Sequence, residues 1–191
     1  MRRTLAALAL ALAPVAPGLL VAPAALLAPA PAAAEDAEII EIRVRRGFET
    51  LYATVPGARE LAAQAKGVLM MPEITKAGLI VGGSYGEGAL RVNGSTVDYY
   101  SVASASIGLQ AGAQRSSQAV FFMTEEALER FRRSDGWNLS ADAEVTLPPG
   151  GEALSASTAT AQKPIIALTF GQKGILAGVS MAGAKYSRIV R

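Results

Sequence analysis

The side chains that could do chemistry are mostly hydroxyls and carboxylates. Ser101, Ser104 and Ser106 lie close together in one segment, and Asp142 and Glu144 stand two residues apart in another. A serine needs a base to become a nucleophile, and the chain has neither a histidine nor a Ser-x-x-Lys spacing. We therefore interpret the serines as small sheet residues. The carboxylate pair has two interpretations. It could belong to a hydrolase or calcium site, or it could lie on a solvated strand face, and no Asp-rich calcium loop is present.

The complete absence of histidine and cysteine restricts the function further. It removes the usual base near neutral pH, the thiol nucleophile and the preferred ligands of zinc, copper and haem iron. It also excludes disulfides, so stability has to come from an ordinary core. We expect a protein that is not an enzyme, with no cofactor and no metal site.

Other conspicuous residues have structural interpretations. The segment 82–88 is rich in glycine, but it lacks the Gly-Lys-Ser/Thr ending of a phosphate loop and precedes a strand instead of a helix. We interpret it as a bend, because glycines in strands mark bulges and corners. Trp137 and the pair Phe121 and Phe122 are predicted to lie in the core.

The N-terminal segment has the pattern of an export signal. Arg2 and Arg3 precede an apolar run, and alanines end the segment before Glu35, which predicts a cleaved signal over residues 1–34. A retained membrane anchor is the alternative, but five prolines interrupt the run. The arginine pair leaves twin-arginine export open. We expect an exported protein, periplasmic or associated with the envelope.

The remaining residues, 35–191, are predicted to form a single domain. Arg2 and Arg3 account for the whole formal charge of +2, so this part of the chain is balanced. That balance disfavours nucleic acid as a partner. After Glu152 every charged side chain is basic, and these residues are Lys163, Lys173, Lys185, Arg188 and Arg191.

Hydrophobic periodicity predicts helices at both ends of a run of strands. Spacings of three and four predict an amphipathic helix over Asp36–Val55, a second over Ala58–Lys66 ending at Gly67, and an inserted helix over Glu125–Arg133 capped by Thr124. Alternation predicts strands, with a tight turn at Asn93-Gly94. They span residues 68–71, 78–84, 89–92, 96–102, 106–114, 118–124, 137–147, 165–170, 175–180 and 184–190. The fold class is therefore α+β, a mainly antiparallel, curled or barrel-like sheet with an N-terminal amphipathic helix and one inserted helix.

The first helix has two interpretations. It packs on the sheet, or it lies at a membrane interface with Phe48 and the isoleucines toward the lipid and Arg43, Arg45 and Arg46 toward the head groups. Packing is the default for such a helix. The basic C-terminal residues could add attraction of about 1 kcal/mol each near an anionic surface, or they could be ordinary solubilising side chains.

Several glycine-bearing blocks, in order, resemble the SYLF domain, in what looks like its bacterial exported branch. The blocks are Lys66–Pro72, Lys76–Gly88, Ser106–Gln114, Phe122-Met123, Ala127–Phe131 and Lys173–Ser180. The resemblance implies lipid binding, because eukaryotic members bind phosphoinositides and other acidic lipids and associate with actin. An exported protein would meet no actin, so the acidic-lipid tendency is what transfers.

The family's lipid contacts involve its N-terminal helical part and basic residues, which implies Arg43, Arg45 and Arg46 here. Together with Phe48, Lys173, Lys185 and Arg188 they make the expected lipid-binding set. We expect a non-enzymatic protein of the bacterial envelope that binds acidic phospholipid at a membrane surface. A structural or protein-interaction module without lipid affinity, with protein partners unknown, is the alternative.

Overall fold

The computed structural model describes residues 36–78, 81–107, 112–138, 145–147, 163–174 and 184–191. Its helices are α1 (Ala37–Thr54), α2 (Ala58–Gln64) and α3 (Glu125–Arg133). The predicted start of α3 is confirmed, because the Thr124 side chain accepts a hydrogen bond from the Ala127 amide at 3.2 Å. Gly67 was predicted to follow α2, but the helix ends at Gln64 and Gly67 is the first residue of β1.

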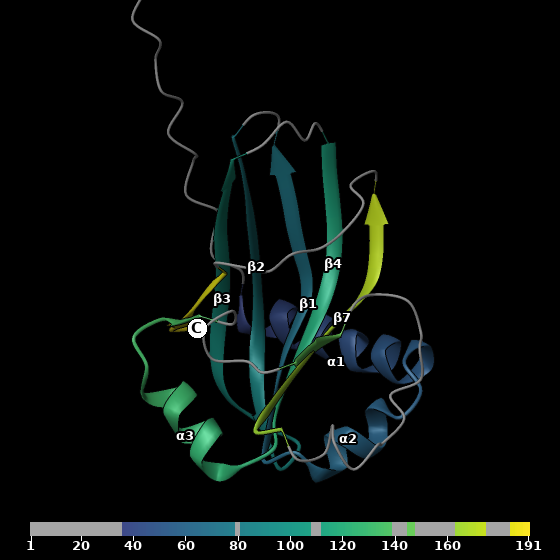
Figure 1. The fold of residues 1–191 in the computed structure, drawn as a ribbon, viewed down its shortest axis with the longest axis vertical. Helices are drawn as coiled ribbons and strands as arrows, with labels where there is room; N and C mark the ends of the chain where they lie inside the picture. The colour runs from purple at the N-terminus through teal and green to yellow at the C-terminus, as the bar shows by residue number, and fades with distance from the viewer. Residues whose placement is uncertain (1–35, 79–80, 108–111, 139–144, 148–162, 175–183) are drawn as a thin grey trace, which may run out of the picture. The chain divides into compact units, whose positions relative to one another are not determined.

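The strands form one curled sheet in the order β5-β8-β3-β2-β1-β4-β7-β6 (Figure 1). The long central strands are β1 (Gly67–Gly78), β2 (Val81–Val92), β3 (Ser95–Ile107) and β4 (Gly112–Phe122). Beside them lie β7 (Ile165–Gly174) and β8 (Lys185–Ile189), with short edge strands β5 (Trp137–Asn138) and β6 (Val145–Leu147). All pairings are antiparallel except that of β6 with β7. The α+β class and the curled, mainly antiparallel sheet are confirmed.

The strand boundaries differ from those predicted. The predicted strands 68–71 to 118–124 are pieces of four longer strands, and 108–111 and 175–183 lie outside the described residues. The predicted strand 137–147 is divided, because β5 pairs with β8 at one edge and β6 with β7 at the other. Asp142 and Glu144 fall between the two, outside the described residues.

The glycine-rich segment does not interrupt the strand, because it runs inside β2, but it does mark a β-bulge. Met70 pairs with Ala89 and Glu73 with Glu87, so two β1 residues oppose Gly88 alone, which is a β-bulge. A Cβ on Gly88 would lie 2.0 Å from the carbonyl oxygen of Met70. Gly88 is therefore required by the close approach of the bulged strand.

Alternating side chains of the strands pack into two hydrophobic cores, one on each face of the sheet. Met70, Phe121 and Ile166 join the helices α1 and α2 on one face, which we call the α1 face. Leu69, Phe122 and Trp137 join α3 on the other, which we call the α3 face. Trp137, Phe121 and Phe122 are 3%, 0% and 0% exposed, so their prediction as core residues is confirmed.

The α3 face also holds polar groups deep in the curl of the sheet. The Tyr186 hydroxyl on β8 donates a hydrogen bond to Gln118 Oε1 on β4, although three strands separate β8 from β4 in the sheet. Ser84 and Ser104 share a hydrogen bond of 2.7 Å between β2 and β3. These contacts agree with the interpretation of the serines as sheet residues.

Helix α1 packs on the sheet through one apolar stripe, Ile40, Val44, Gly47 and Leu51, all buried. This confirms packing, because α1 contacts β1, β2 and β7 and Phe48 packs against the same core. Of the isoleucines, Ile40 is buried and Ile39 remains 43% exposed. Within the described residues, no helix has the length and apolarity needed to cross a membrane. The described residues also hold no group of three or more acidic side chains that could bind a metal ion.

Candidate functional site

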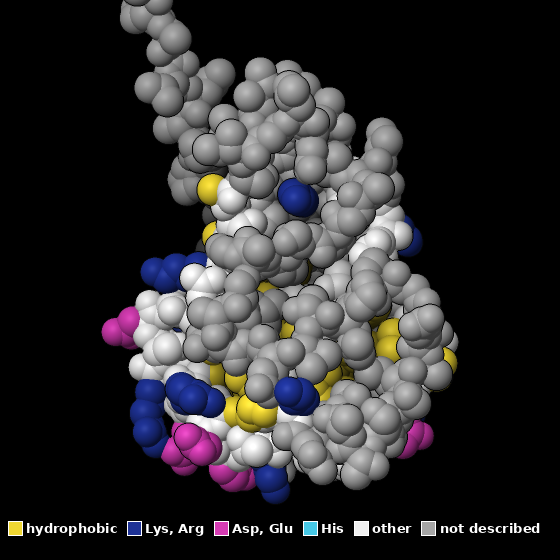
Figure 2. All heavy atoms as spheres, in the orientation of Figure 1, with side chains coloured by type: hydrophobic (Ala, Val, Ile, Leu, Met, Phe, Trp, Pro, Cys, Tyr) yellow, Lys and Arg dark blue, Asp and Glu magenta, His cyan; other side chains and the backbone are white. Residues whose placement is uncertain are grey.

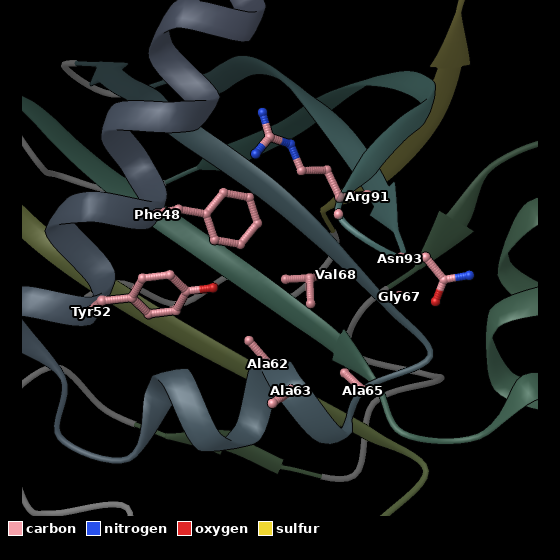
Figure 3. A pocket seen from close by; sticks show the side chains of 10 residues that line it. Phe48, Tyr52, Ala62, Ala63, Ala65, Gly67, Val68, Arg91 and Asn93 are labelled. Carbon is pink, nitrogen blue, oxygen red and sulfur yellow. The ribbon is translucent and has the colours of Figure 1, made fainter.

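A pocket of about 370 Å³ opens between α1, α2 and the hairpin that joins β2 to β3 (Figure 3). Val68 of β1 lies at its centre, alanines of α2 line one side, and two aromatic rings of α1 line another. The turn Asn93-Gly94 forms the far end, and both residues have positive φ (51° and 79°), as the sequence predicted for a tight hairpin. The complete lining is Phe48, Tyr52, Ala62, Ala63, Ala65, Gly67, Val68, Arg91, Asn93 and Gly94.

Two arginines lie against the aromatic rings. Phe48 and Tyr52 stand one helical turn apart on α1, with ring centroids 5.8 Å apart. The Arg91 guanidinium carbon is 5.2 Å from the Phe48 centroid, and that of Arg59 is 4.4 Å from the Tyr52 centroid. Both distances are within the range of cation–π attraction. Arg91 therefore brings positive charge into the lining of the apolar pocket, and Arg59 lies outside the lining, against the Tyr52 ring.

Glu41 of α1 holds Arg91 in place. Arg91 Nη2 donates a hydrogen bond to Glu41 Oε2 at 3.0 Å, and the Tyr99 hydroxyl donates one to Glu41 Oε1 at 3.2 Å. Burial alone would raise the pKa of Glu41, but the nearby polar groups of Thr96, Arg91 and Tyr99 and the charge of Arg91 hold that pKa below the ordinary value. The pKa of Tyr99 is raised by burial and by the Glu41 charge. Glu41 is thus ionised at neutral pH and anchors one side of the guanidinium.

The Tyr52 side chain adds a polar group to the apolar wall. Its phenol oxygen points toward Val68 in the pocket. Burial raises the pKa of Tyr52, while the charges of Arg59 and Arg91 act in the opposite direction. Tyr52 is therefore protonated near neutral pH and can donate a hydrogen bond to a bound molecule.

The structure places the predicted residues of α1 on different sides of the helix. Arg45 and Arg46 are exposed, Arg43 is half-buried, and Phe48 is half-buried against the core of the α1 face. Only Phe48 lines the pocket. Of the three predicted arginines, Arg45 and Arg46 are thus the ones that α1 exposes to solvent.

The three predicted residues of the C-terminal part, Lys173, Lys185 and Arg188, do not lie together on the sheet. Lys173 lies on β7, and four strands separate β7 from β8, which carries Lys185 and Arg188. Arg188 Nη1 is 3.4 Å from Asp98 Oδ1, and Nε of Arg132 on α3 is 3.3 Å from Oδ2 of the same carboxylate. Lys185 and Arg188 are three residues apart on β8, so their side chains leave opposite faces of the sheet.

The sequence interpretation missed Arg91, Arg59 and Tyr52. Tyr52 could have been found, because it follows Phe48 by four residues on a helix that was predicted correctly. Arg91 could not, because its place beside Phe48 follows from the pairing of Val68 with Arg91 across β1 and β2. That register depends on the bulge in β1 and is not visible in the local pattern.

Comparison with known proteins agrees with the resemblance read from the sequence. No curated protein matches the chain. The family model Ysc84, described as Las17-binding protein actin regulator, matches residues 103–189. The match runs from within β3 to the last residue of β8, so α1, α2 and the pocket lie outside it. The resemblance to the SYLF family is thereby confirmed over residues 103–189.

Proposed function

We propose that the protein binds acidic phospholipid through the outer surface of α1 and works by binding alone, without catalysis. The observation that carries the proposal is the exposure of Arg45 and Arg46 on a helix whose opposite side is buried against the sheet. Neither arginine has an acidic partner among the described residues. Near an anionic membrane each such side chain contributes about 1 kcal/mol of attraction.

The charged surface around α3 offers a poorer membrane contact. Figure 2 shows Lys and Arg side chains mixed with Asp and Glu side chains at the lower left, where Figure 1 places α3. Arg133 pairs with Glu129 on the helix, and Arg132 pairs with Asp98. Paired charges of this kind give little net attraction to an anionic surface.

The proposal also places the protein in the bacterial envelope and gives it a non-catalytic role. The export signal predicted over residues 1–34 supports a place in the bacterial envelope, where lipid head groups are available and actin is not. The chain's lack of histidine and cysteine supports a non-catalytic role. The actin regulation named in the family description belongs to that family and is not carried over to this chain.

Vesicle flotation tests the proposal. The protein, expressed from residues 1–191, is mixed with vesicles of neutral phosphatidylcholine or with vesicles that also contain anionic phosphatidylglycerol. The floated fraction is measured at low and high salt. We expect flotation with the anionic vesicles only, and less of it at high salt because surface attraction is screened. No flotation with either vesicle would refute lipid binding and favour the protein-interaction alternative.

A matched pair of double variants tests the site. Arg45→Gln with Arg46→Gln should reduce flotation on anionic vesicles by about tenfold, since two contributions of about 1 kcal/mol are removed and part is lost to screening. Arg130→Gln with Arg133→Gln makes the same charge change on α3 and should leave flotation within about twofold. Equal losses in the two variants would show that net charge, and not the α1 surface, drives binding.

A further inference from the structure

We propose that the pocket between α1, α2 and the β2–β3 turn is a binding site for one single-chain amphiphile with an anionic head, such as a fatty acid. The inference deepens the proposed function and rests on it for the ligand class, but it concerns a different surface. Lipid binding by the outer arginines of α1 needs no pocket, so the two can fail separately.

The lining fits an aliphatic chain. Val68, Gly67 and the alanines of α2 present only aliphatic or backbone surface, and Phe48 and Tyr52 close the wall with aromatic rings. Alanines leave room where larger side chains would fill the space between α2 and the sheet. A volume of about 370 Å³ is at the lower end of the range for small-molecule sites, about 300–1,000 Å³. It suits one chain and is small for a two-chain lipid.

The charges fit an anionic head. Arg91 carries five N–H donors, and its described partner, Glu41, occupies one nitrogen, Nη2. Arg91 Nε is buried and has no hydrogen-bond partner among the described residues. Arg59, on the other aromatic ring, has no acidic partner in that same part of the chain. Two cations against one carboxylate leave net positive charge beside an apolar wall, which is complementary to an amphiphilic anion.

The polar groups are placed to orient such a molecule. Arg91 lies at the edge of the pocket above Phe48, and Asn93 lies beside it at the turn. Tyr52 directs its phenol into the middle. A carboxylate or phosphate at the Arg91 end would leave the chain over Val68 and the alanines, and the reverse orientation would place a charge on apolar surface at a large cost.

The test uses soluble probes below their micelle concentrations and the protein expressed from residues 1–191. Isothermal titration compares decanoate and decyl phosphate with decyltrimethylammonium, and with acetate and inorganic phosphate as heads without a chain. We expect one molecule of decanoate or decyl phosphate per chain, and at least tenfold weaker binding of the cation and the bare heads. Absence of binding by both decyl anions, or equal binding of the cation, would overturn the proposal.

Three variants locate the site. Ala62→Trp fills the pocket and should abolish decanoate binding. Arg91→Gln should weaken it about tenfold, whereas Glu41→Gln should strengthen it by a few fold, because the competing carboxylate is gone. A purely structural role of the Arg91 and Glu41 pair would make both changes act in the same direction. Arg132→Gln removes an arginine paired with Asp98 on the α3 face and should change nothing.

A measurement on the unaltered protein keeps the test decisive if a variant fails to fold. Decanoate should shift the backbone amide resonances of Gly67, Asn93 and Gly94, and leave those of Leu128 and Trp137 on the α3 face unchanged. Shifts confined to the α3 face would overturn the site. Flotation without decanoate binding would refute the pocket alone, and decanoate binding without flotation would refute the outer surface of α1 alone.

Discussion

Two buried tyrosines provide a direct test of how the curled sheet is held closed. Tyr186 and Tyr100 are 1% and 2% exposed and belong to the same core cluster. The Tyr186 hydroxyl donates to Gln118 across the curl, whereas the Tyr100 hydroxyl has no partner among the residues that the structure describes. Replacing each by phenylalanine removes one oxygen and leaves the ring. The two substitutions should therefore differ in their effect on stability.

The expected magnitudes follow from what each hydroxyl leaves behind. Tyr186→Phe strands the Gln118 carbonyl in the core, and Gln118 Nε2 already lacks a partner in the described residues. An unsatisfied buried polar group costs about 1–3 kcal/mol, which corresponds to a Tm lower by roughly 2–12 °C in a domain of this size. Tyr100→Phe removes a hydroxyl that is itself unsatisfied, so it should be neutral or slightly stabilising.

Thermal unfolding followed by circular dichroism, with urea unfolding at 25 °C as a second measure, compares the two variants with the unaltered protein. The difference in unfolding free energy between the variants, and not either value alone, is the tested quantity. Equal losses for both would refute the contact between β8 and β4, because the two rings would then contribute through packing only.

The remaining predictions concern the bulge, the last residue and alkaline pH. Gly88→Ala should cost about 3 kcal/mol, as in overpacked cores, and Gly83→Ala should cost less, because its Cβ would meet Ser104 O at 3.2 Å whereas that of Gly88 would meet Met70 O at 2.0 Å; equal urea midpoints would contradict this. Arg191→Ala should cost about 3 kcal/mol, since Glu87 is 4% exposed and pairs with Arg191 at 2.6 Å; unchanged urea unfolding would count against that pair. Burial, then the Asp98 charge, raises the pKa of Tyr100 from 10.0 to about 12. Because Tyr100 ionises more readily in the unfolded chain, its contribution to the free energy of unfolding is complete below pH 10 and is lost as the pH rises through 12. Urea unfolding at about pH 9 and pH 11.5 should therefore show a smaller loss for Tyr100→Phe, and an equal loss would assign the change to other groups.

The sequence predicted the helices well because their signals are local. The start of α3 depends on Thr124 and the residues within one turn of it, and α1 depends on apolar spacing alone. The end of α1 is also signalled locally, by Pro56-Gly57 just after the helix. No tertiary contact has to be known to find these elements.

The strands were harder because their lengths depend on partners. The glycines of 82–88 disfavour a strand locally, but pairing of β2 with β1 and β3 along its length overrides that preference. Gly88 is tolerated inside the strand because the bulge opposite it leaves no room for a side chain. The division of 137–147 between two edges could not be predicted, since both pieces pair with strands from the end of the chain.

The bulge also explains how the pocket comes to exist. Gly47 of α1 lies over it, where an added Cβ would be 2.9 Å from Met70 Sδ and 3.2 Å from the Pro72 Cβ. The helix therefore approaches β1 closely at this point, and the next residue along α1 is Phe48, which lines the pocket. Because one turn of helix rigidly links Phe48 to Tyr52, the height of α1 above the sheet sets how far both rings stand from Val68. Through the approach of α1 to β1, Gly47, Gly88 and Pro72 thus influence the width of the candidate site.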